Sequence, residues 1–219
     1  MRILDEFEPD WKKIYQVNDF ARPQELEEQE VQQIPPPGCS PLSPVTFDSL
    51  DMPQTLRQNA TRLHLTSLSP VQRYSFPAFA SGNDVIMIAP TGSGKTFAFL
   101  FPLLGQILEK DLKRAVGTPC EYQNKQTPAP AHPLAVVISP TRQLALQTLQ
   151  EFFKASAGTG VLGRAMVGAP SINEQLSLLK QGCDVVFCTV NALRDAVELN
   201  ALYLDQCRFL VVDEADRCV

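Results

Sequence analysis

The residue pattern most suited to chemistry in this chain is APTGSGKT, at positions 89–96. The apolar run VIMI precedes it at 85–88, and a helix-like segment follows it at 97–108. A loop between a strand and a helix can direct several backbone N–H groups at a phosphate, and glycines let its backbone curl without side-chain clash. The pattern therefore predicts a site for a nucleoside triphosphate, formed by Ala89, Pro90, Thr91, Gly92, Ser93, Gly94, Lys95 and Thr96.

Two residues of this loop carry specific roles in the prediction. The Lys95 ammonium is expected to reach the β- and γ-phosphates, and the Thr96 hydroxyl to hold Mg²⁺. Ala89 stands where the general pattern has glycine, a mild departure. The alternative interpretation is a Gly-Ser turn that leads into a helix. That alternative requires the Lys-Thr pair to occupy these two positions by chance.

A second group of chemically suited residues is Asp213-Glu214-Ala215-Asp216, directly after the apolar run at 209–212. An acidic residue at the tip of a buried strand can hold the Mg²⁺ that bridges two phosphates, and a neighbouring carboxylate can polarise the attacking water. Acids also complement the dipole at a helix N-terminus, but that role does not explain their pairing with an upstream phosphate loop. We predict that Thr96 and Asp213 bind the metal, and that Lys95, Asp213 and Glu214 are catalytic.

The elements that must position these residues alternate along the chain. Helices are expected near 52–65, at 70–80 with Ser69 as N-cap, at 142–153 and at 171–179. Apolar strands are expected before the phosphate loop and at 134–138, 164–167, 184–188 and 209–212. Continuous apolar strands that alternate with helices predict an α/β fold, a parallel sheet with helices on both faces. Ligands in such folds bind at the carboxyl ends of the strands.

The first 44 residues differ in composition from the remainder. Nine of the 24 acidic side chains but only four of the 19 basic ones lie in residues 1–34, so the rest of the chain is balanced. We expect an acidic, mobile arm with a possible protein partner, for which Trp11 is an anchor. IPPPGCSPLSP at 34–44 is expected to be a stiff linker, and the domain to begin near Val45. A polar, proline-rich surface loop is expected at 115–133.

The cysteines and the absence of targeting segments in the sequence indicate the cellular compartment in which the protein is expected. The six cysteines include no CxxC pair, and the only histidines are His64 and His132, so we expect free thiols and no zinc site. The N-terminus lacks a signal-peptide core, and the apolar stretch at 97–108 is too short to span a membrane. These patterns predict a soluble protein of the cytoplasm or nucleus.

Four motifs in order resemble those of one family. They are Phe47 with the downstream Ser69-Pro70-Val71-Gln72, the loop at 89–96, Pro140-Thr141-Arg142-Gln143-Leu144-Ala145, and Asp213-Glu214-Ala215-Asp216. From about Val45 onward, the chain resembles the first RecA-like domain of a DEAD-box ATP-dependent RNA helicase. The resemblance implies that Gln72 reads the adenine edge and that Phe47 stacks on the base. It also implies that Asp216 belongs to the catalytic residues and links to a coupling motif, and that RNA phosphates are contacted by Pro140, Thr141, Arg142, Gly168 and Thr189.

Several positions depart from the family pattern. Gln143 replaces the usual Glu, Gly168-Ala169 replaces Gly-Gly, His64-Leu65 replaces a Gly-aromatic pair, and Thr189-Val190-Asn191-Ala192 stands in place of Thr-Pro-Gly-Arg. The last change removes a guanidinium that contacts phosphate, so we expect a looser grip on RNA and an intact ATP site. These changes are alternatively tolerated lineage variations. Two other functions stay open: a non-catalytic helicase remnant that binds RNA or protein, and a DNA helicase or other P-loop ATPase, against which the Gln72 motif argues.

The chain ends at Val219, just after Asp216. The resemblance implies a following Ser-Ala-Thr motif and a second RecA-like domain that supplies arginine fingers. The family's strand that leads to Ser-Ala-Thr lies between the phosphate-loop strand and the strand at 209–212. We therefore expect a RecA-like domain that is incomplete at its C-terminus, folds poorly by itself and hydrolyses ATP slowly.

Overall fold

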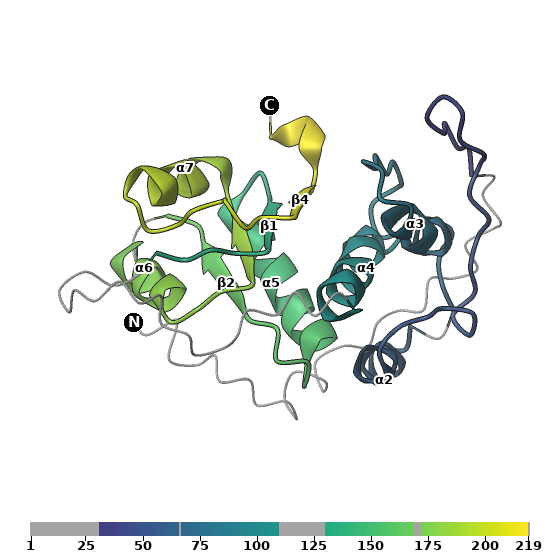
Figure 1. The fold of residues 1–219 in the computed structure, drawn as a ribbon, viewed down its shortest axis with the longest axis horizontal. Coiled ribbons are helices and arrows are strands. Elements are labelled where there is room, and N and C mark those ends of the chain that lie inside the picture. Colours follow the sequence, from purple (N-terminus) through teal and green to yellow (C-terminus); the bar gives the residue numbers. More distant parts are fainter. Residues whose placement is uncertain (1–30, 66, 110–129, 169–171, 219) are drawn as a thin grey trace. The chain divides into compact units, whose positions relative to one another are not determined.

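The computed structural model describes residues 31–65, 67–109, 130–168 and 172–218 (Figure 1). The chain divides into two compact units, one of Met1–Gln106 with Phe153–Thr159 and one of Ile107–Phe152 with Gly160–Val219. Most of the expected acidic arm, most of the expected loop at 115–133 and Ala169 lie outside the described residues. Within residues 31–44 there is no helix or strand, and the backbone turns where Cys39 N donates to Pro36 O at 3.0 Å.

The second unit contains a four-stranded parallel sheet. Its strands are β1 (Ala135–Ile138), β2 (Gly163–Met166), β3 (Val185–Cys188) and β4 (Phe209–Val212), in the order β2-β3-β1-β4. The register pairs Ala135 with both Val185 and Phe209. All four strands were expected from the sequence. The reasoning that a strand covered on both faces has no polar positions to keep in water applies to β3, which is buried throughout, whereas β2 contains Arg164 and the edge strand β4 leaves Leu210 and Val212 exposed. The prediction of a parallel α/β sheet is confirmed.

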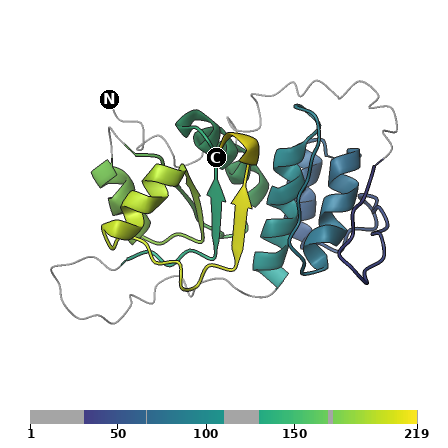
Figure 2. The ribbon, with the colours of Figure 1, turned by 90° about the horizontal axis from the view of Figure 1, so that it is seen from above.

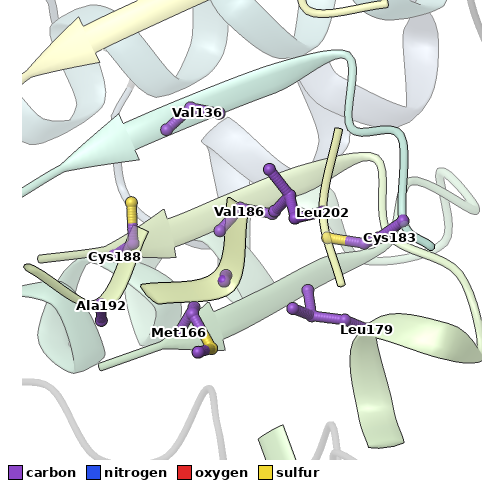
Figure 3. Packing of buried hydrophobic residues seen from close by; sticks show 10 residues of the cluster. Val136, Met166, Leu179, Cys183, Val186, Cys188, Ala192 and Leu202 are labelled. Atoms are coloured by element: carbon purple, nitrogen blue, oxygen red, sulfur yellow. The ribbon is translucent and has the colours of Figure 1, made fainter. Parts of the chain in front are cut away.

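Helices cover both faces of this sheet (Figure 1; Figure 2). They are α5 (Arg142–Ser156), α6 (Ile172–Lys180) and α7 (Val190–Glu198). Alternate residues of β3 face opposite ways, as strand geometry requires. Val186 and Cys188 pack in one cluster with Leu179 of α6 and Ala192 of α7 (Figure 3), whereas the Phe187 ring lies 5.1 Å from that of Phe152 in α5.

One glycine allows α5 to approach the sheet closely. A Cβ added to Gly163 at the start of β2 would lie 2.6 Å from the Phe152 ring, closer than carbon atoms approach without displacement. Phe152 is fully buried at this contact. The helix α7, which begins directly after Thr189, was not predicted from the sequence. Residues 189–192 were interpreted only as a variant of a family motif, although residues 190–198 have the spacing of an amphipathic helix.

The described part of the first unit is helical. It contains α2 (Gln54–Arg62), α3 (Pro70–Ala80) and most of α4 (Lys95–Glu109). The expected bounds of α3 are confirmed: Ser69 has extended backbone angles at the N-cap, and Pro70 occupies the first helical position, where its missing N–H removes no hydrogen bond. The helix expected at 97–108 is also present and begins two residues earlier, at Lys95.

The strand expected before the phosphate loop is a wrong prediction. Residues 84–90 have no regular secondary structure, and Ile86 and Ile88 are 92% and 94% exposed. A strand satisfies its backbone N–H and C=O groups only by pairing with a neighbour. All four strands of the described residues belong to the second unit, so within its own unit this apolar segment has no strand to pair with.

A buried asparagine joins α2 to the end of α5 within the first unit. The Asn59 side chain is fully buried, and its Nδ2 donates to Ala155 O at 2.9 Å and to Ala157 O at 2.8 Å. The last carbonyls of a helix have no partner inside the helix. Asn59 therefore supplies donors to backbone carbonyls that burial separates from water.

We expect Asn59→Ala to destabilise the protein. The change leaves two buried carbonyls without their donor, and each such loss costs about 1–3 kcal/mol. The free energy of unfolding, measured by urea titration, should fall by about 3 kcal/mol. The neighbouring exposed residue gives the control, Gln58→Ala, which should have little effect. Equal stability of the two variants would contradict the role assigned to Asn59.

Candidate nucleotide and RNA site

The predicted phosphate loop keeps the geometry of an anion site even without a preceding strand. Gly92 and Gly94 have φ of +79° and +90°, a region that side chains disfavour, so glycine is required at both positions. The loop ends at the N-terminus of α4, where backbone N–H groups lack partners within the helix. The Lys95 Nζ donates to Ala89 O at 2.5 Å and to Pro90 O at 3.0 Å. The ammonium thus lies over the loop's own backbone.

A second feature of the loop is a polar group without a partner. The Ser93 hydroxyl is buried, and it makes no hydrogen bond within the part of the chain that the structure describes. Leaving a buried hydroxyl unsatisfied costs free energy, so such a group calls for an explanation. An oxygen-rich anion that accepts from the Ser93 hydroxyl, from nearby amides and from Lys95 would satisfy it.

Gln72 connects the phosphate loop to α3. Its Oε1 accepts from the Ser69 N–H at 3.0 Å, and its Nε2 donates to Gly94 O at 3.2 Å. The side chain is 4% exposed. An amide has two N–H donors and two acceptor lone pairs, so one donor and one acceptor of Gln72 are left after these contacts. The remaining pair suits the edge of a base that offers one acceptor and one donor.

Phe47 and Gln72 lie on the same cavity. The residues that line it are mostly aromatic or aliphatic, among them Phe76, Phe97 and Phe101. The cavity measures about 10 Å³, the room of one water molecule, so it shows that Phe47 and Gln72 are neighbours and does not itself accommodate a base. The predicted adenine residues Phe47 and Gln72 are therefore brought together, as are the members of the phosphate loop, all within the first unit.

The acidic residues follow the edge strand of the sheet in the second unit. Asp213 N donates to Ile138 O at 2.9 Å, which extends the β1–β4 ladder, and Asp213 Oδ1 accepts from Glu214 N at 3.0 Å. The Glu214 carboxylate pairs with Arg217 at 3.0 Å, and Asp216 lies in the short 3₁₀ helix Ala215–Arg217. Burial and these three carboxylates raise the pKa of the Cys218 thiol. The end of β4 is thus strongly anionic.

Glu214 has an unusual backbone conformation. Its φ and ψ are +47° and +51°, the left-handed region that costs a residue with a side chain about 1–3 kcal/mol. Such strain persists only where the surrounding structure imposes it, and it is concentrated at functional sites. No sequence pattern predicted this conformation. It turns the chain sharply after β4 and keeps Glu214 at the strand end beside Asp213.

The predicted RNA-contacting residues occupy the ends of the other three strands. Pro140, Thr141 and Arg142 follow β1, Gly168 follows β2 and Thr189 follows β3. Thr141 Oγ1 accepts from Leu144 N at 3.2 Å and so caps α5, which begins at Arg142, and Thr189 is the N-cap residue of α7. Since the strands are parallel, these residues and Asp213 share one edge of the sheet in the second unit.

Comparison with known proteins decides the family. Residues 69–219, more than half of the chain, match the DEAD/DEAH box helicase family. The chain belongs to this family. The Ser69-Pro70-Val71-Gln72 segment, the phosphate loop and the acidic residues after β4 all lie inside the matched region of this DEAD/DEAH box helicase domain.

Relatives extend the match to named helicases. The chain is 35% identical over 175 residues to the ATP-dependent RNA helicase glh-3 of Caenorhabditis elegans, covering 80% of this chain and 23% of that protein. It is 33% identical over 178 residues to the probable ATP-dependent RNA helicase DDX4 of Homo sapiens, covering 81% of this chain and 23% of that one. The chain therefore spans about a quarter of the length of these curated relatives.

A solved structure supports the fold of this DEAD/DEAH box helicase domain. The RNA helicase Prp28 from Chaetomium thermophilum, crystallised with ADP, aligns with a TM-score of 0.66 at 31% identity. The alignment covers 80% of this chain and 39% of that one. The predicted RecA-like fold is confirmed. Among the helices in the described ranges, none has both the length and the apolar character that crossing a bilayer requires.

One residue that supports the predicted RNA contact at Gly168 was not predicted from the sequence. Gln175 of α6 is buried, its Oε1 accepts from Val167 N at 2.7 Å and its Nε2 donates to Gly168 O at 2.8 Å. It thus fixes the backbone where β2 ends and Gly168 takes a φ of +80°. The available signal was a polar residue on the apolar face of a helix, one turn before the buried Leu179.

We expect Gln175→Leu to weaken RNA binding about tenfold while it leaves ATP affinity unchanged, because it releases the Gly168 backbone and leaves the buried Val167 N–H and the half-buried Gly168 carbonyl without their partner. Fluorescence anisotropy with a labelled single-stranded RNA measures the first effect, and a fluorescent ATP analogue the second. Glu174→Gln, at the exposed neighbouring position, is the control. If Gln175→Leu binds RNA as tightly as the control does, the backbone near Gly168 does not contribute to RNA binding.

Proposed function

We propose that this chain is the ATP-binding part of an ATP-dependent RNA helicase, in which ATP binding and hydrolysis drive the remodelling of RNA duplexes. The observation that carries the proposal is the glycine loop at the N-terminus of α4, with the Lys95 ammonium and an unsatisfied Ser93 hydroxyl on it. Family membership and the names of the relatives support the same activity.

Adenine recognition is assigned to the first unit. The free donor and acceptor of the Gln72 amide would bind the edge of the base, and the Phe47 ring would stack on its face. Because Gln72 also contacts Gly94 O, an occupied base site and the conformation of the phosphate loop are linked through one side chain. The proposed preference for ATP over other triphosphates rests on the donor and acceptor of Gln72 that are left for the base edge.

Magnesium ligands are proposed within each unit by itself. In the first unit the Thr96 hydroxyl, and in the second unit the Asp213 carboxylate, is a hard oxygen ligand of the kind that Mg²⁺ prefers, and the ion would neutralise phosphate charge. Glu214 is proposed to accept the proton of the attacking water, and Asp216 to link this end of β4 to the rest of the full-length protein. Lys95 would stabilise charge on the γ-phosphate.

RNA contact is proposed for the carboxyl edge of the sheet. The N-termini of α5 and α7 begin there, next to Thr141 and Thr189, and helix N-termini attract phosphate. Arg142 supplies a guanidinium at the same edge.

An intracellular, reducing compartment is also our proposal. It is supported by the free cysteines of the described residues, two of them fully buried.

The test measures ATP hydrolysis by the full-length protein that carries this chain, with and without RNA, and unwinding of an RNA and a DNA duplex. We expect hydrolysis to be stimulated by RNA and unwinding to need ATP and an RNA strand. Stimulation by DNA alone would favour a DNA helicase.

The alternative is a non-catalytic remnant that binds RNA or protein, favoured by the Thr189-Val190-Asn191-Ala192 segment. It predicts RNA binding without any ATP turnover. In the structure Thr189 occupies the N-cap position of α7 at the sheet edge, without a side-chain capping hydrogen bond, so the altered segment keeps a helix N-terminus for phosphate while lacking the guanidinium. This favours weakened rather than abolished RNA contact.

A further inference from the structure

The segment that carries Phe47 has no regular secondary structure of its own. Residues 45–50 lie outside any helix or strand, and a turn is closed where Thr46 N donates to the Ser49 hydroxyl at 3.0 Å. Val45 N donates to Arg73 O at 3.0 Å, which ties one end of the segment to α3. Because loops are more mobile than helices and strands, the Phe47 ring keeps one orientation only if contacts with other elements hold this segment in place.

Arg57 of α2 is the residue that fixes it. Its Nη1 donates to Phe47 O at 3.1 Å, and its Nη2 donates to Leu50 O. Its Cζ lies 5.3 Å from the centroid of the Phe47 ring, within the range of a cation–π contact. One planar guanidinium therefore binds the backbone on either side of the turn and one face of the aromatic ring.

We propose that Arg57 is a positioning residue for base recognition, which sets the orientation of the Phe47 ring against the adenine of ATP. The proposal rests on the function proposed above, because it assumes that Phe47 stacks on the base. With the guanidinium on one face of the ring, a purine can stack only on the opposite face. The ring then presents one fixed face to a base, next to Gln72, which lines the same small cavity as Phe47.

The chemistry of the guanidinium makes this role specific. Lysine carries the same charge but has no fork, so it cannot donate to both carbonyls in the same geometry while it covers the ring. The contacts involve the base side of the site only. Arg57 is therefore expected to affect ligands that contain adenine and to leave the binding of phosphate groups alone.

The experiment compares the affinities of three probes, ADP, ATP and inorganic tripolyphosphate, for the full-length protein by isothermal titration calorimetry. We expect Arg57→Met to weaken both adenine nucleotides about tenfold and to leave tripolyphosphate unchanged. Arg57→Lys should recover only part of the loss. Arg62→Met, at an exposed arginine of the same helix, removes the same charge and should bind all three probes like the wild type.

A double-mutant cycle separates positioning from general stability. If Arg57 acts through Phe47, then Arg57→Met should have almost no further effect on ADP affinity in a Phe47→Ala background. Additive losses, or an equal loss for tripolyphosphate, would overturn the proposal. If Arg57→Met does not fold, Arg57→Lys replaces it in the cycle. Its smaller loss of ADP affinity should likewise disappear in the Phe47→Ala background.

The result also distinguishes this inference from the proposed function. A wild-type protein that binds no adenine nucleotide overturns both. A wild-type protein that binds ADP, and that loses the binding on Phe47→Ala but not on Arg57→Met, leaves the proposed function intact and overturns the role of Arg57 alone.

Discussion

Lys95→Ala is expected to weaken ATP binding about 100-fold. The ammonium is the cationic side chain of the phosphate loop, and charge-assisted hydrogen bonds to phosphate contribute about 1.5–3 kcal/mol each. Two such bonds lost correspond to about 3 kcal/mol or more, which is a factor of about 100 in the dissociation constant. Titration of the full-length protein with ATP by calorimetry measures the change directly.

In the structure, Lys95 also binds the carbonyls of Ala89 and Pro90, so its loss could loosen the loop itself. Circular dichroism of Lys95→Ala checks that the helices remain. Arg208→Ala serves as the charge-matched control, because Arg208 is exposed and precedes β4 at the edge of the sheet opposite to Asp213. If ATP affinity were the same in Lys95→Ala and Arg208→Ala, the assignment of the phosphate loop would be wrong.

Glu214→Gln should abolish most ATP hydrolysis while ATP binding persists. A side chain that accepts a proton in the transition state contributes about 10²–10⁴ in rate, and the amide of glutamine cannot take that proton. The substitution keeps the size of the side chain, and its oxygen can still accept from Arg217. The rate should therefore fall by that factor in a single-turnover assay with saturating RNA.

The matched control for Glu214→Gln is Glu198→Gln, at an exposed residue of α7 that also pairs with an arginine, Arg194, at 3.8 Å. It should hydrolyse ATP at the wild-type rate. A Glu214→Gln protein that binds ATP normally and retains more than about a tenth of the wild-type rate would show that another group takes the proton.

The four strands of the second unit and its helices α5 and α6 could be predicted closely because each one is specified locally, whereas α7 was not predicted. The run at 209–212 is apolar throughout and is bounded by the charged residues Arg208 and Asp213, so its limits could be predicted to the residue. Pro70 after Ser69 likewise marks the start of α3 without reference to the rest of the chain. Local sequence determines such boundaries because backbone propensity and capping involve only neighbouring residues.

The apolar run at 85–88 shows where this reasoning fails. Its composition predicts a strand as strongly as that of 185–188 does, yet only the latter pairs with neighbours, β1 and β2. Pairing is a property of the surrounding sheet and not of the segment. Ile86 and Ile88 remain exposed for that reason, and no inspection of residues 85–88 by themselves could have indicated it.

The sequence by itself determined the family, the chemistry of the phosphate loop and of the acidic residues after β4, and the α/β class, because these depend on residue types at short, fixed spacings. Tertiary structure alone decided which side chains support the site. Gln72 meets Gly94 across 22 positions, Arg57 reaches back 10 positions to Phe47 O, and Glu214 takes a left-handed conformation. These two contacts join residues that are distant in sequence, so no short motif predicts them. The left-handed conformation of Glu214 is imposed by the surrounding structure and cannot be predicted from the neighbouring residue types.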